Sequence, residues 1–202
     1  MINQSPAKRL RLKITLEGSD PPIWRRLEVI DDITFFQLHR VIQQAMGWED
    51  CHLHEFVVAR ARVGTRSADD AMFMVRDVML PERSTRLFEL LEGRRKFRYW
   101  YDFGDDWWHE AVIEKRLPPD AAAKPAVLLD GARACPPEDC GGIPGYFNLL
   151  EIMADPAHEE HGDVLDWLGG TFDPETLDFT TRARKVAGVF RSSKRSKEAD
   201  AG

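Results

Sequence analysis

Apolar and polar positions alternate strictly near the start of this chain. In RLRLKITLE, residues 9–17, every even position is leucine or isoleucine and every odd position is charged or polar. A period of two residues predicts a strand with one buried face and one solvent-facing side. GSDPP, residues 18–22, is typical of a turn, and IWRRLEVI, residues 23–30, is the predicted antiparallel partner. The pattern therefore indicates a β-hairpin.

The apolar spacing changes to that of a helix at the next segment. Apolar residues recur every three or four positions from Phe35 to Ala45. Thr34 and Gln37 have the Thr-x-x-Gln spacing of a capping box, which satisfies backbone N–H groups where a helix starts. Gly47 stands where a helix commonly ends. These signals predict a helix between Thr34 and Gly47.

Two further strands are predicted after this helix. The first covers residues 53–59, and the second is AMFMV, residues 71–75, with the polar break RVGTRSADD between them at 62–70. The order strand, strand, helix, strand, strand resembles a β-grasp arrangement, in which a helix packs on one face of a mainly antiparallel sheet. The predicted fold class is therefore α+β.

A second hairpin is predicted around YDFGDDWWHE, residues 101–110. Aromatic and polar residues alternate over residues 96–103, the chain turns at 104–106, and a return strand covers residues 107–115. The outgoing strand should hold on one face Phe97, Tyr99, Tyr101 and Phe103, and the return strand should hold on one face Trp107, His109, Ala111 and Ile113. YDFGDDWWHE is then the tip of the hairpin.

The remaining segments are helices joined by loops. Helices are predicted near residues 87–91, 146–154, 164–168 and 180–190, each bounded by Pro or Gly signals. LPPDAAAKPA, residues 117–126, is a connector, and DGARACPPEDCGGIPG, residues 130–145, is a loop. We predict a single α+β domain over residues 8–191, with helices packed on one side of the sheet, and a flexible basic tail at 192–202.

The charge of the chain is divided unevenly. The net charge is −6, yet residues 182–197 hold seven Lys or Arg and no acidic residue, so the remainder carries −13 (−6 minus +7). An acidic body argues against broad binding of nucleic acid, which leaves the basic tail as the segment that could contact it. No apolar run approaches the roughly 18 residues of a membrane helix. We expect a cytoplasmic protein that does not enter membranes.

The hairpin tip holds residues that bind divalent cations in other proteins. Asp102, Asp105 and His109 are candidate metal ligands, because carboxylates beside an imidazole suit a hard or borderline ion. The alternative is structural. Asp105 and Asp106 would then shape the turn by bonding to the backbone, and His109 would be an ordinary sheet residue.

The loop CPPEDCGG, residues 135–142, is the second candidate. Cys135 and Cys140 could share a tetrahedral zinc ion, with His54 and His109 completing the ligand set. The chain has three cysteines, a number too small and odd for a disulfide framework. The glycines are not followed by Lys-Ser or Lys-Thr, so nucleotide binding is not expected.

The two motifs together carry a family resemblance. YDFGDDWWH, ACPPEDCGGIPGY and the later WLGG and FDPE resemble the family named after the third open reading frame of plasmid pRiA4b, also described as passenger proteins of bacterial insertion elements. The resemblance extends from Leu10 to about Phe190. It implies an α+β fold and carriage by plasmids or mobile elements, with no established activity. Members often carry a cysteine shortly before the CPPEDCGG loop, where this chain has Leu128, and this difference argues against a thiolate zinc site.

Two hypotheses for function follow. The favoured one is a binding or adaptor module with a polar cleft formed by YDFGDDWWH and CPPEDCGG and with a protein as partner. The other is a metal-dependent hydrolase that uses the same cleft, with Asp102, Asp105 and His109 as ligands and Glu138 as general base. The cofactor that either allows is a divalent metal such as zinc. Both require the two motifs to touch, with Asp102 or Asp105 hydrogen-bonded to the cysteine loop or to His109.

Overall fold

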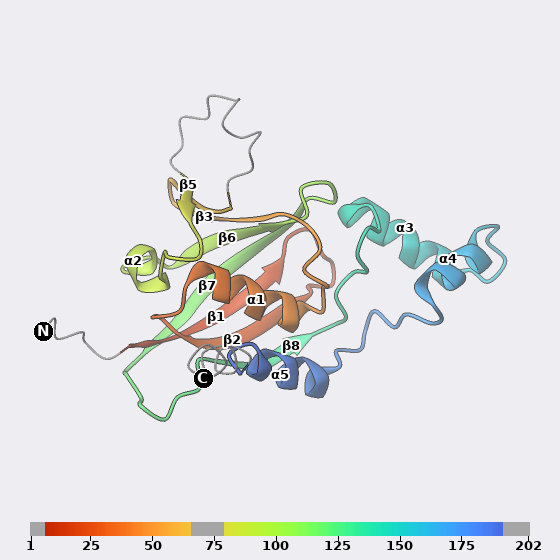
Figure 1. The fold of residues 1–202 in the computed structure, drawn as a ribbon. Helices are drawn as coiled ribbons and strands as arrows, with labels where there is room; N and C mark the ends of the chain where they lie inside the picture. Colours follow the sequence, from red (N-terminus) through yellow and green to blue (C-terminus); the bar gives the residue numbers. More distant parts are fainter. Residues whose placement is uncertain (1–6, 66–78, 192–202) are drawn as a thin grey trace, which may run out of the picture.

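The computed structural model describes residues 7–65 and 79–191 of the chain. Within these residues the strands form one eight-stranded sheet in the order β5-β4-β3-β6-β7-β1-β2-β8 (Figure 1). Neighbouring strands are antiparallel, except for the parallel pair β4 and β5. The strands are β1 (Arg9–Leu16), β2 (Trp24–Ile30), β3 (His54–Val58), β4 (Ala61–Gly64), β5 (Met79–Pro81), β6 (Lys96–Tyr101), β7 (Trp107–Leu117) and β8 (Ala126–Ala132).

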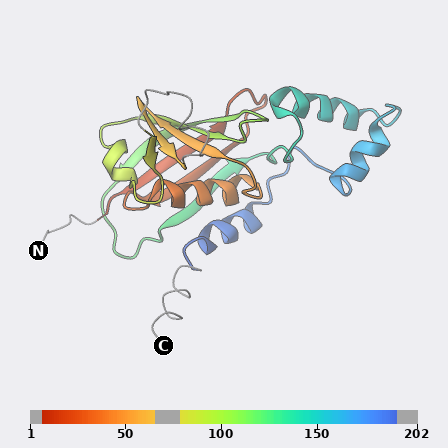
Figure 2. The same cartoon turned by 45° about the horizontal axis from the view of Figure 1, so that its top comes forward.

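Five helices accompany the sheet in the described residues, namely α1 (Phe35–Met46), α2 (Leu87–Leu91), α3 (Gly142–Ala154), α4 (His161–Leu168) and α5 (Phe179–Gly188). α1 crosses one face of the sheet, and α5 lies beside α1 and against β8 (Figure 1). α3, α4 and the residues between them extend beyond the end of the sheet, and we call them the helical arm (Figure 2). The predicted α+β class with a mainly antiparallel sheet is confirmed. In the described part of the chain, no helix has the length and apolar character needed to cross a membrane.

The sequence pattern of β1 and α1 explains how the sheet acquires its buried face. The even positions of β1 are buried and the odd positions are partly exposed, as the period of two predicts. The apolar positions of α1 belong to the same core, so the helix covers this face. The predicted capping box is confirmed, since Thr34 Oγ1 accepts from the Gln37 N–H at 3.2 Å and Gln37 Oε1 accepts from the Thr34 N–H at 2.9 Å. Each buried aliphatic side chain contributes roughly 1.5–3 kcal/mol, so this packing is the main source of stability.

Three strands differ from the sequence prediction, namely β4, β5 and β8. β5 covers Met79–Pro81, which no predicted element includes. β4 occupies part of the segment that the sequence assigns to a polar break, and it pairs with β3. β8 is not expected from the sequence, because it follows a Pro- and Ala-rich connector and buries only Ala126 and Leu128. The predicted strand AMFMV, residues 71–75, and the tail at 192–202 lie outside the described residues.

Arg25 interrupts the buried face of β2. Leu27 and Val29 on that face are buried apolar residues, and Arg25 itself is only 1% exposed. Its guanidinium donates hydrogen bonds to the main-chain oxygens of Ala45 at 2.7 Å and Ala132 at 2.9 Å. Ala45 belongs to the last turn of α1, where carbonyl groups lack helical partners and the helix dipole favours a cation. Arg25 therefore ties the end of α1 to β2 and β8.

We predict that Arg25→Met lowers the free energy of unfolding by about 3 kcal/mol, because it leaves buried carbonyl groups without donors. Arg26 is the matched control on the same strand, since its guanidinium pairs with Glu114 and Asp130 nearer the surface. Arg26→Met should cost less than about 1 kcal/mol. Urea denaturation followed by circular dichroism measures both values. Equal costs would contradict the role assigned to Arg25.

Candidate functional site

The tip of the β6–β7 hairpin docks on the cysteine loop, residues 135–142. The Gly141 N–H donates a hydrogen bond to Asp105 Oδ2 at 3.1 Å, and the Tyr101 hydroxyl donates one to Glu138 Oε1 at 3.0 Å. Gly142 has a φ of +68°, and a Cβ atom there would lie 2.4 Å from the carbonyl oxygen of Asp105. Glycine permits this approach because it has no Cβ and tolerates a positive φ. The predicted contact between the two motifs is confirmed through Asp105.

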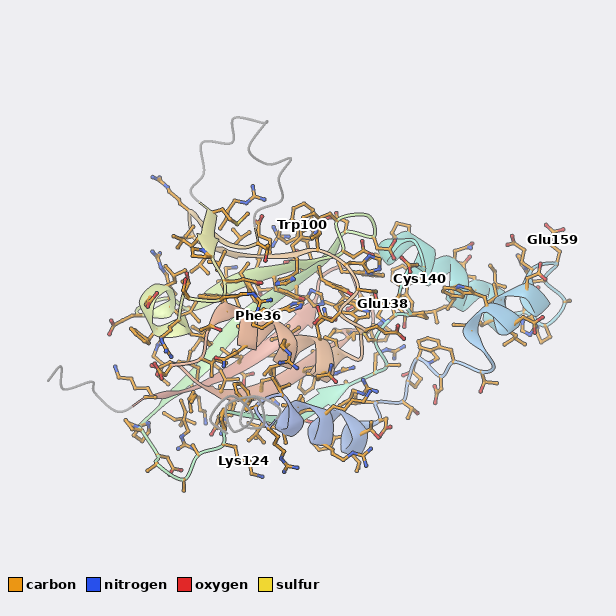
Figure 3. All side chains as sticks on the ribbon, viewed as in Figure 1. Phe36, Trp100, Lys124, Glu138, Cys140 and Glu159 are labelled. Carbon is orange, nitrogen blue, oxygen red and sulfur yellow. The ribbon has the colours of Figure 1, made fainter. Side chains whose placement is uncertain are left out.

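The residues that follow α1 also contact both motifs. The Trp48 ring packs 4.8 Å from the Tyr101 ring, and Trp48 Nε1 donates to the Pro136 oxygen at 3.2 Å. The Glu49 N–H donates to Glu138 Oε1 at 2.9 Å. Figure 3 shows Glu138 near the end of α1, on the side towards α3. Three segments that are distant in the sequence, namely the hairpin tip, the cysteine loop and the residues after α1, therefore meet at one place, which we call the junction.

His52 lies at this junction and faces three carboxylates. Its Nε2 atom lies 3.2 Å from Asp139 Oδ1, 3.6 Å from Asp102 Oδ2 and 3.9 Å from Glu138 Oε2. Among the described residues, His52 Nε2 and Glu138 Oε2 are buried atoms without a hydrogen-bond partner. We call His52, Asp102, Glu138 and Asp139 the His52 cluster. Its polar atoms lie close together, but His52 Nε2 and Glu138 Oε2 form no hydrogen bond with the other members of the cluster.

The geometry of the cluster allows two overlapping ligand sets. His52, Asp102 and Asp139 each place one ligand atom within 4.8 Å of the others, and so do Cys51, His52 and Glu138. Asp102 is 6% exposed, whereas Cys51 is exposed. Each set therefore has one exposed member, Asp139 in the first and Cys51 in the second, and only the first contains a buried residue, Asp102.

Unusual backbone conformations are concentrated around the His52 cluster. Left-handed φ values at non-glycine residues include four aspartates in or beside it, namely Asp50 (61°), Asp102 (52°), Asp106 (60°) and Asp139 (54°). Aspartate adopts this conformation more readily than most residues, and strained backbone is often found at functional sites. Two of these aspartates belong to the His52 cluster, so their backbone conformation helps to direct their carboxylates.

The left-handed turn at Asp102 also corrects one sequence prediction. Strict alternation places Phe103 on the same face as Tyr101, but Phe103 is 42% exposed while Tyr101 is buried. β6 ends at Tyr101, and the Phe103 ring packs on the Trp100 ring at 4.2 Å on the other side. The change of conformation at Asp102 turns its carboxylate inward and Phe103 outward.

Burial raises the pKa of several groups at the junction. It raises the pKa of Glu138, opposed by the hydrogen bonds from Glu49 and Tyr101. Burial also raises the pKa of Tyr101, so the phenol stays protonated and donates to Glu138. It raises the pKa of Cys140 to about 12 and raises that of Cys135 further. Both thiols of the loop are therefore neutral near pH 7.

The predicted metal ligands are dispersed. Asp102 enters the His52 cluster, whereas Asp105 is bonded to the cysteine loop. His109 is fully buried in the core, with Nδ1 3.3 Å from the main-chain oxygen of Tyr99. His54, the first residue of β3, has its Nε2 atom 2.6 Å from Glu82 Oε2. Neither ligand set of the described residues contains Cys135 or Cys140.

His52 belongs to the cluster, but the sequence pattern did not identify it as a candidate ligand. CHLHEF contains His52 and His54, and the predicted strand favoured the second of them. The observed β3 begins at His54, while the N–H of Asp102 donates to the Leu53 oxygen at 2.9 Å and brings the hairpin tip beside His52. The usable signal was the adjacent pair Cys51 and His52, which offers two ligand types just before a strand.

The chain is similar to a known family and to individual proteins. Residues 8–181 match the family model of plasmid pRiA4b ORF-3-like proteins. The chain belongs to this family. The uncharacterized protein y4hQ of Sinorhizobium fredii is 37% identical over 183 residues, which cover 89% of this chain and 91% of that protein. The crystal structure of MM3350 from Methanosarcina mazei Go1, a protein of unknown function, has a TM-score of 0.76 and 35% identity and covers 87% of this chain and 98% of that chain. The resemblance carried by the motifs is confirmed.

We predict that His109 makes stability depend on pH. Burial lowers the pKa of His109 from 6.5 to about 4. In the unfolded chain the imidazole of His109 takes up a proton below about pH 6.5, whereas in the folded chain it does so only near pH 4. The free energy of unfolding therefore falls as the pH decreases from about 6.5 to about 4. The expected loss is roughly 3 kcal/mol.

The substitution His109→Leu should remove this part of the pH dependence, measured by urea denaturation at several pH values. His158→Leu, at a partly exposed position, is the control and should leave the slope unchanged. An identical slope in the His109 variant and the unsubstituted protein would show that other groups cause it.

Proposed function

We propose that the chain is a binding module whose polar cleft holds a divalent cation between His52, Asp102 and Asp139. The observation that carries this proposal is the buried His52 Nε2 atom, which has no hydrogen-bond partner in the described residues and faces the carboxylates. A buried polar atom without a partner costs free energy, and a bound cation would remove that cost. A neutral imidazole nitrogen and two carboxylates would also balance the charge of a divalent ion.

The spacing of the donor atoms supports a cation. Ligands about 2.1 Å from an ion lie roughly 3.0–3.4 Å from one another in octahedral or tetrahedral geometry. His52 Nε2 lies 3.2 Å from Asp139 Oδ1 and 3.6 Å from Asp102 Oδ2, so small side-chain rotations would complete the geometry. One nitrogen with carboxylate oxygens suits borderline ions such as Zn²⁺ or Mn²⁺.

The surrounding contacts support a preformed site. Asp102 Oδ1 accepts a hydrogen bond from the Gly104 N–H at 3.0 Å, which leaves Oδ2 for His52. Asp139 belongs to the loop that the Gly141–Asp105 hydrogen bond fixes to the hairpin. Ligands held by such outer contacts bind with less loss of conformational entropy.

We predict that the metal-free protein binds one equivalent of Mn²⁺ or Zn²⁺ in isothermal titration calorimetry. Removing a ligand by His52→Ala should weaken binding by at least about tenfold. His158→Ala is the matched control, because it removes a histidine far from the cluster in the sequence and should leave the affinity unchanged. Absence of binding by the unsubstituted protein, or equal affinity of both variants, would refute the site.

A second candidate function is metal-dependent hydrolysis in the same cleft, and one observation favours it. Glu138 Oε1 is held by the Tyr101 hydroxyl and the Glu49 N–H, while Oε2 is buried, has no partner in the described residues and lies 3.9 Å from His52 Nε2. A carboxylate oxygen oriented towards a cation can take a proton from an attacking water. In this hypothesis Glu138 is the general base, as in the sequence analysis.

For the hydrolase, we predict turnover of bis(p-nitrophenyl) phosphate or p-nitrophenyl acetate when Mn²⁺ or Zn²⁺ is present. Glu138→Gln should lower the rate by about 100-fold or more while cation affinity changes little, because the substitution removes the base and keeps the shape. Absorbance of released p-nitrophenol measures the rate. Lack of turnover by a protein that binds the cation would reject the hydrolase and retain the binding module.

A further inference from the structure

The helical arm carries an open groove beside the cysteine loop. It encloses about 360 Å³ between α3, α4 and the end of that loop. Its apolar lining comes from both helices, namely Leu149, Ile152, Val164 and Trp167. α4 has no buried residue, and the Trp167 side chain is 52% exposed. An exposed tryptophan in an apolar groove marks a surface that another molecule can cover.

The rim of this groove is acidic. Asp139, Glu160 and Asp163 line it together with the apolar residues. From residue 142 to residue 168 the arm has six Asp or Glu and no Lys or Arg. Figure 3 shows Glu159 at the far end of the arm, away from the sheet. The arm therefore carries negative charge that it has no basic residue of its own to neutralise.

We propose that the groove binds a basic amphipathic segment of a protein partner. Apolar side chains of that segment would cover Trp167 and fill the groove, while its Lys or Arg side chains would reach the rim carboxylates. Aromatic residues in such grooves commonly supply much of the binding energy. The negative charge of the arm disfavours phosphate backbones and anionic membranes as occupants. This inference goes beyond the cation site, because Trp167, Glu160 and Asp163 lie outside the His52 cluster.

The probe is a fluorescein-labelled peptide of about 14 residues, which is four helical turns, with leucines at helical spacing and lysines elsewhere. Fluorescence anisotropy with the full chain should show binding that weakens as salt is added. Trp167→Ala and Asp163→Lys should each weaken it by about tenfold or more. Glu159→Lys makes the same charge change outside the groove lining and should weaken binding less than about threefold.

Three controls keep the result specific. A peptide with glutamate in place of every lysine should not bind. The circular dichroism spectrum and the Mn²⁺ affinity of Trp167→Ala should match those of the unsubstituted protein, which separates this surface from the cation site. Lack of binding to the lysine peptide, equal binding of the glutamate peptide, or unchanged affinity of Trp167→Ala would overturn the proposal. So would a dimer in light scattering that Trp167→Ala dissociates, because a second copy would then cover the groove.

Discussion

The close approach of the hairpin tip to the cysteine loop is the contact on which the rest of the arrangement depends. A side chain at Gly142 would collide with the carbonyl oxygen of Asp105, and the adjacent Gly141 N–H could then no longer bond to the Asp105 carboxylate. α3 begins at Gly142, so the same contact fixes the cysteine loop beside the hairpin tip and sets the direction in which the helical arm leaves the sheet. The cation site and the groove both depend on it.

Local periodicity predicts the parts of the fold whose stability comes from neighbours in the sequence. The alternation in β1 and the capping box at Thr34 were sufficient for their elements. β4 and β8 were not predicted because a partner strand supplies their hydrogen bonds, whereas their own apolar pattern is short. The exposure of Phe103 was also missed, since a left-handed residue at Asp102 reverses the alternation and periodicity does not encode that reversal.

The sequence predicted where the candidate site lies, but it identified only some of the residues that form it. The density of charge and aromatic rings pointed to the hairpin tip and the cysteine loop, which do touch. His109 was a candidate because it is close to Asp102 in the sequence, but its strand face also holds Trp107 and is the core face. His52 arrives on the segment after α1, and the contacts of Trp48 and Glu49 with the cysteine loop position it. Those contacts are tertiary, so no local pattern reveals them.

The distribution of ion pairs links the cation site to the groove. On the open face of the sheet, acidic side chains are paired with arginine, as Glu28 is with Arg9 and Glu17 is with Arg98. Within the described residues, the carboxylates of the His52 cluster have no Lys or Arg within 4.0 Å, and His52 is their only neighbour of the basic residue types. Asp139 belongs to that cluster and also lines the groove of the helical arm. Repulsion among these carboxylates opposes folding, and a bound cation or a basic partner would offset it at the same end of the molecule. The two ligands should therefore weaken each other's binding, because each neutralises charge that helps to attract the other.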